Sequence, residues 1–101
     1  MNNNTLVFKI SDQNDFSKLN ASQNITNFIA DLSTLKNGMH KLLINNFTKF
    51  EKYVRANNGS FVIVSKVNFD DSLNIVPTLQ EAYDFIDMED MERQLNLKLK
   101  L

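Results

Sequence analysis

The chain contains one histidine, His40, and no cysteine, which restricts the chemistry that its side chains can perform. A histidine acting as a general base needs a carboxylate or a nucleophile within hydrogen-bond reach, and the residue spacing around His40 suggests neither. Nucleophilic triads fail for the same reason, because they need a suitably placed histidine. We therefore expect His40 to lie on the surface or the rim of the fold, and we expect no enzymatic activity.

Carboxylates are the second group of side chains capable of catalysis or metal binding. They gather in the second half of the chain: Asp70, Asp71, Asp84, Asp87, Glu89, Asp90 and Glu92. Paired carboxylates can bind Ca²⁺ or Mg²⁺, but the sequence has no D-x-[DN]-x-[DN]-G loop. A thiolate zinc site is excluded by the lack of cysteine. Charge runs of this kind are typical of a solvated helix face, so we expect no metal and no other cofactor.

A basic face is the third candidate, formed by Lys41, Lys49, Lys52 and Arg55. Nucleic-acid binders usually carry a strong positive balance, whereas this chain has 11 basic and 12 acidic residues and a formal net charge of −1. We see no aromatic residue interleaved on that face for base stacking. The 2 glycines, Gly38 and Gly59, cannot make a Gly-rich phosphate loop. Nucleic-acid binding is therefore not expected.

The elements that must position these residues begin with three apolar, β-prone segments. The first comprises Leu6, Val7, Phe8 and Ile10, the second residues 25–32, and the third residues 61–64. Continuous apolar runs such as the second and third are typical of strands buried on both faces of a parallel sheet. Between the first two, Asp12 or Asn14 is a candidate cap for a short helix that carries Phe16 and Leu19.

The longest periodic segment predicts a helix before the third strand. Its apolar residues recur at spacings of three and four, and they are Met39, Leu43, Phe47, Phe50 and Val54, with Leu42 and Tyr53 widening the stripe. Asn57-Asn58-Gly59 supplies a left-handed stop. This segment should cover one face of the sheet.

A fourth strand and a second helix are predicted after a polar link. Residues 65–72 are too few for an ordinary parallel crossover, so residues 73–76 either pair antiparallel or follow a compact, irregular crossing. Thr78 and Glu81 form a capping box for a helix that buries Leu79, Ala82, Tyr83 and Ile86. Asp87 is a candidate restart, because Met88, Met91 and Leu95 lie on a rotated stripe.

These elements predict an α/β fold: a small mixed sheet of about four strands flanked by helices. Residues 1–95 should form a single domain, followed by a C-terminal tail at 96–101. In that tail Leu95, Leu97, Leu99 and Leu101 alternate with polar residues, a period-two pattern. It indicates either a frayed, solvated end or an added edge strand that docks internally or on another chain.

Three stretches resemble the STAS domain of anti-sigma-factor antagonists and sulfate transporters. They are residues 28–33 (FIADLS), 61–65 (FVIVS) and 75–82 (IVPTLQEA). The second stretch and residues 75–95 are most similar to small STAS-like proteins of Bacteroidetes, some of which carry the name ribonuclease Z. The resemblance covers residues 25–95. It implies a STAS-like fold and a partner-binding surface at the turn that follows the second strand.

Two departures limit what this resemblance implies. STAS antagonists carry a phosphorylatable serine in a D-S-x-G-type turn, but the corresponding turn here, residues 34–39 (TLKNGM), has no hydroxyl beside Gly38. The nearest hydroxyls belong to Ser33 and Thr34. Ribonuclease Z activity needs two metal ions held by several histidines and aspartates, and one histidine cannot build that site.

The sequence therefore predicts a non-enzymatic, STAS-like regulatory module that binds a protein partner. The candidate contact residues are Ser33, Thr34, Asn37, Gly38, Met39 and His40. The alternatives are an accessory RNA-processing protein that binds tRNA or a nuclease, and a structural homodimer built on the tail. No apolar run approaches the ~20 residues that span a bilayer, and no secretory signal is evident, so we expect a cytoplasmic protein without membrane contact.

Overall fold

The computed structural model describes residues 4–10, 25–36 and 38–99, with the side chains of 97–99 left out of the description. The elements are β1 (Thr5–Lys9), β2 (Asn27–Asp31), the 3-10 turn η2 (His40–Leu43), α1 (Ile44–Ala56), β3 (Phe61–Val64), β4 (Ile75–Val76) and α2 (Leu79–Leu99). The helix predicted around Phe16 and Leu19, like Asn37, lies outside the described residues.

The sheet has four strands in the order β1-β2-β3-β4, and every neighbouring pair is parallel. The predicted α/β class with about four strands is confirmed, but the sheet is parallel throughout and not mixed. The link after β3 makes the compact crossing: Phe69 and Leu73 pack on the core beneath the sheet, so apolar anchors replace a crossover helix.

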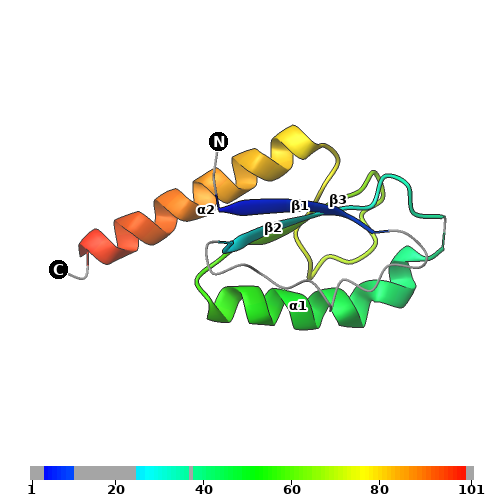
Figure 1. Cartoon of the computed structure of the whole chain (residues 1–101), viewed down its shortest axis with the longest axis horizontal. Coiled ribbons are helices and arrows are strands. Elements are labelled where there is room, and N and C mark those ends of the chain that lie inside the picture. Colours follow the sequence, from blue (N-terminus) through cyan, green and yellow to red (C-terminus); the bar gives the residue numbers. More distant parts are fainter. Residues whose placement is uncertain (1–3, 11–24, 37, 100–101) are drawn as a thin grey trace.

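The two helices cover opposite faces of the sheet (Figure 1). On the α1 face, Phe47 and Val54 pack against Phe28, Phe61 and Ile63. On the α2 face, Ala82 and Ile86 pack against Ile29 and Val62. All four residues of β3 are buried, as the continuous apolar run predicts. Burying one such large side chain contributes roughly 1.5–3 kcal/mol.

The turn between α1 and β3 confirms the predicted left-handed stop. Asn58 has φ 61°, which asparagine tolerates better than most residues. Gly59 serves another purpose, because a Cβ built on it would lie 1.7 Å from the carbonyl oxygen of Thr26. Only glycine therefore lets this turn approach the chain entering β2.

Helix α2 is longer than predicted. The backbone amide of Glu81 donates a hydrogen bond of 3.1 Å to Thr78 Oγ1, which confirms the cap. The helix then continues without a restart at Asp87 and includes Leu95, Leu97 and Leu99. The edge-strand interpretation of the tail is thus wrong for these residues: Leu, Lys and Gln are good helix formers, and this part of α2 lies beyond the sheet edge (Figure 1).

Several apolar residues that the helical spacing assigns to buried stripes are exposed. Leu42 and Tyr53 lie on the outside of η2 and α1, and Leu79 is exposed at the start of α2. Met88, Met91 and Leu95 are also exposed, because α2 projects past the sheet that covers its first half. In the described part of the chain, neither helix is long and apolar enough to cross a membrane.

Candidate functional site

The carboxyl ends of β2, β3 and β4 meet at one edge of the sheet and surround a pocket of about 290 Å³. The lining residues come from the end of β3, from the segments that follow the three strands, and from η2: Leu32, Ser33, Leu35, His40, Val64, Ser65, Lys66, Val67 and Pro77. Ligands of open α/β sheets bind outside the carboxyl ends of the strands. This pocket is therefore the candidate site.

The turn after β2 is exposed but firmly held. Leu32 donates its backbone amide to Val64 O at 2.9 Å, and the amide of Leu35 donates to Leu32 O at 3.1 Å. The amide of Ser33 donates to Asp31 Oδ1 at 2.9 Å, so the carboxylate closes the turn. Because Leu35 is buried, Ser33 and Thr34 are presented outward on a fixed backbone.

The chain then reverses at Gly38 to enter η2. Gly38 has φ +90°, and a Cβ built on it would meet no atom within 4 Å, so glycine serves here for its backbone freedom. The amide of Met39 donates to Lys36 O at 3.2 Å, and the amide of Leu42 donates to Met39 O at 3.1 Å. These bonds set the direction of the helical segment that follows.

His40 is buried, with 8% of its surface exposed, so the expected surface position is wrong. Its ring lies 5.3 Å from that of Phe69, which in turn lies 6.1 Å from Phe47. The link after β3 folds back over η2 and covers the imidazole. Within the described residues, the imidazole forms no hydrogen bond, and His40 is one of the residues that line the pocket.

Two polar residues of the pocket, Ser65 and Lys66, were missed by sequence reasoning. Ser65 Oγ donates to Val67 O at 3.0 Å and accepts from the Val67 amide at 3.1 Å, so this buried hydroxyl holds its own loop. Lys66 is exposed. Their position directly after a buried parallel strand would have predicted them as site residues, because ligands bind outside the carboxyl ends of such strands.

The structure brings together only part of the predicted contact set. Ser33 and His40 line the pocket, whereas Thr34, Gly38 and Met39 do not. Met39 packs against the core, and Thr34 and Gly38 are exposed on the turn. Thr34 and Gly38 therefore form an outer surface of the turn, while Ser33 and His40 belong to the pocket.

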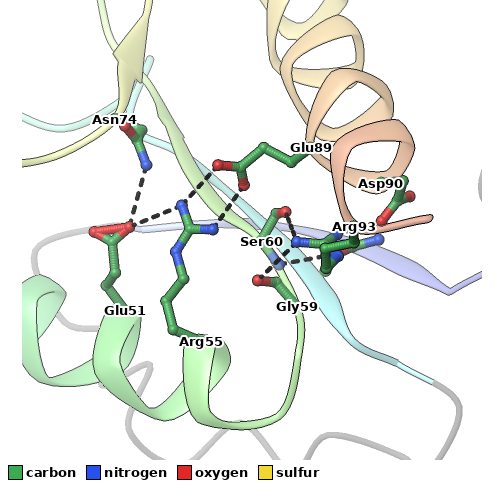
Figure 2. Close-up of polar contacts among 9 residues, drawn as sticks. Glu51, Arg55, Gly59, Ser60, Asn74, Glu89, Asp90 and Arg93 are labelled. Carbon is green, nitrogen blue, oxygen red and sulfur yellow. Dashed lines mark hydrogen bonds and ion pairs between the residues drawn. The ribbon is translucent and has the colours of Figure 1, made fainter. Parts of the chain in front are cut away.

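Five charged residues of the two helices form a cluster near Ser60, just before β3 (Figure 2). Arg55 pairs with Glu89 at 2.9 Å and lies 3.6 Å from Glu51. Arg93 pairs with Asp90 and donates to Ser60 Oγ at 3.0 Å. In the described part of the chain, no group of three or more acidic or histidine side chains is arranged to hold a metal ion.

Burial shapes the charges in this cluster. Burial raises the pKa of Glu51, and the positive charge of Arg55 opposes that rise only in part. Burial disfavours the charge of Arg55, but the hydrogen bonds and the charge of Glu89 outweigh it, so the guanidinium pKa is raised. Outside the cluster, the backbone hydrogen bond from Ser72 lowers the pKa of Asp70. Glu51, Glu89 and Asp70 thus serve as hydrogen-bond or ion-pair partners within the fold.

Comparison of this chain with protein families, with curated proteins and with solved structures gives no match. Its function therefore has to be inferred from the residues themselves.

Proposed function

We propose that this chain is a non-enzymatic, STAS-like regulatory module that binds a protein partner at the carboxyl edge of its sheet. The observation that carries the proposal is Leu42, which is 70% exposed and lies in η2, two residues after His40. A large apolar side chain held outward beside a fixed turn costs little to desolvate and loses little freedom on binding.

The neighbouring loop adds a second apolar contact. Val67, which borders the pocket, is 53% exposed, and Ser33 and Thr34 supply polar groups at the rim. An apolar centre with a polar rim is the usual anatomy of a protein interface. A specific complex buries roughly 1,200–2,000 Å² in total, which the turn, η2 and this loop would have to supply together.

A binding role fits the pocket better than catalysis. The ring of His40 lies tilted against that of Phe69, and the described residues that line the pocket include no carboxylate that would orient it as a base. The one buried hydroxyl there, on Ser65, is engaged with Val67. Without a base, a nucleophile such as Ser33 stays unactivated, so we assign no reaction to the site.

The experiment is capture of partners from a lysate of the native cells, with mass spectrometry, using wild type and Thr34→Lys/Leu42→Asp. Both residues are exposed, so the double variant should melt like wild type. We expect a stoichiometric partner on wild type that is lost on the double variant. Met91→Asp, which places a charge on α2 far from the turn, is the matched control and should keep the partner. A partner retained by the double variant contradicts the proposal.

Self-association is a second candidate function, favoured by α2. Met88, Met91 and Leu95 are spaced three and four residues apart, as on the seam of a helix pair, and they line a shallow apolar groove with Glu92. That part of α2 projects from the sheet (Figure 1), which leaves room for the same helix of a second copy. Light scattering of wild type and Met91→Asp tests this: a dimer that the substitution converts to monomer supports it.

An RNA-processing role has less support. Arg55 is engaged by Glu51 and Glu89, so the basic face is reduced to Lys41, Lys49 and Lys52. Binding of tRNA that weakens steeply with salt would favour this role.

A further inference from the structure

The lining of the carboxyl-edge pocket has a positive and hydrogen-bonding character. Among the described residues that line it there are one lysine, one histidine and two serines, and no aspartate or glutamate. The carboxylate of Asp31, at the end of β2, accepts a hydrogen bond from the backbone amide of Ser33. The polar groups of this pocket therefore suit a group that carries negative charge.

His40 supports the same conclusion. The residue is more than nine-tenths buried, lines the pocket, and within the described residues has a ring contact with Phe69 but no hydrogen bond. A neutral imidazole carries one N–H donor and a protonated one carries two. An acceptor that enters the pocket would pair with this donor.

The other residues that line the pocket are mostly apolar. Leu32, Leu35, Val64 and Pro77 form apolar walls. Lys66 is exposed at the mouth, and its flexible ammonium can move to meet an entering group. A hydrogen bond between an ammonium and a carboxylate is stronger than one between neutral groups.

Size sets the class of ligand. At about 290 Å³ the pocket is at the lower limit of small-molecule sites, which span roughly 300–1,000 Å³. It holds one short acidic side chain and is too small for a nucleotide. Because the turn beside it is the proposed docking surface, such a side chain would come with the partner.

We propose that the pocket receives the carboxylate of an aspartate or glutamate side chain of the partner, held by His40 and Lys66. This inference rests on the proposed function for the source of the carboxylate, but the chemistry of the pocket can be tested without the partner. Since the chain has 1 histidine, the imidazole resonances in an NMR spectrum report on this pocket alone.

The first test titrates the full chain with N-acetyl-glutamate methylamide and, separately, with its neutral glutamine counterpart. We expect a saturable shift of the His40 resonances with the glutamate compound only. Lys66→Met should weaken that binding about tenfold, the effect of losing one charge-assisted hydrogen bond. Lys49→Met makes the same charge change on the outer face of α1 and should leave the affinity unchanged. Resonances that stay still, or that respond equally to both compounds, overturn the inference.

The second test separates this inference from the proposed function. A partner that is lost on Thr34→Lys/Leu42→Asp and also weakened on Lys66→Met supports both. A partner that is lost on the double variant but binds Lys66→Met as tightly as wild type supports the module and overturns the carboxylate contact. A His40 shift with the glutamate compound, in a chain that captures no partner, overturns the partner as the source and supports a free small carboxylate as the ligand.

Discussion

Arg55 on α1 donates two hydrogen bonds, of 2.9 and 3.0 Å, to the two carboxylate oxygens of Glu89 on α2 (Figure 2). The pair joins helices that cover opposite faces of the sheet. The first half of β3 has no paired strand on the side of β4, because β4 pairs only with Ile63 and Val64. The Arg55–Glu89 pair lies beside this unpaired part of β3 (Figure 2). Asn74 extends the cluster by donating to Glu51 Oε1 at 3.1 Å. This edge is therefore closed by side chains where the strand ladder stops.

Replacing Arg55 by lysine should destabilise the fold, because lysine cannot form the paired hydrogen bonds to Glu89. The side chains are 39% and 20% exposed, so solvent weakens the pair and we expect a loss of about 1 kcal/mol. Urea denaturation measures it, and the double-mutant cycle of Arg55→Ala and Glu89→Ala isolates the coupling. Lys52→Ala, an exposed neighbour on α1, should change the free energy of unfolding by less than about 0.5 kcal/mol. Zero coupling in the cycle would show that the pair contributes nothing.

Glu51 should make stability depend on pH in the direction opposite to an ordinary salt-bridged acid. Burial raises its pKa above the usual 4.5 in the folded state, so the folded protein keeps the proton to higher pH than the unfolded chain. Its contribution is fully present below pH 4.5 and is lost as the pH rises through the folded value. Glu51→Gln does not titrate, and its Oε1 can still accept from Asn74.

The measurement is the free energy of unfolding of wild type and Glu51→Gln at a series of pH values from acid to neutral. The stability of wild type relative to Glu51→Gln should fall as the pH rises. A relative stability that rises over this range would mean that the attraction of Arg55 outweighs burial.

The two glycines should respond very differently to alanine. At Gly59 the new Cβ would meet Thr26 O at 1.7 Å, and the backbone must shift, so we expect a loss of about 3 kcal/mol or more. At Gly38 the space is open and only the left-handed φ of +90° is penalised, at about 1–2 kcal/mol. Thermal melts of Gly59→Ala and Gly38→Ala check the order. Equal losses would show that steric contact at Thr26 is relieved without cost.

The sequence predicts local features of this fold well, because their causes are local. The cap at Thr78, the stop at Asn58 and the buried run of β3 each follow from residues within one or two turns. The parallel pairing of β4 does not, since it depends on Phe69 and Leu73 anchoring the link to the α1 face. A short link alone is equally compatible with an antiparallel strand.

The candidate site was only partly predictable for a related reason. Ser33 and His40 are adjacent to a recognisable turn, but Ser65 and Lys66 join them only because β2 and β3 are parallel neighbours. The burial of His40 comes from Phe69, which is distant in sequence. Leu42 fits the helical spacing of a buried stripe, yet in η2 it is Met39 and Leu43 that pack against the core, and Leu42 is exposed.

That difference between spacing and burial gives the last prediction, on two apolar residues of the same helical segment. Phe47 is fully buried against Phe61 and Phe69, and Phe47→Ala should cost about 3–5 kcal/mol. Leu42→Asp should change stability by less than about 0.5 kcal/mol, because the side chain already lies in water. Urea denaturation of both variants measures this. A large loss for Leu42→Asp would place Leu42 in the core and remove the exposed apolar contact on which partner binding is proposed.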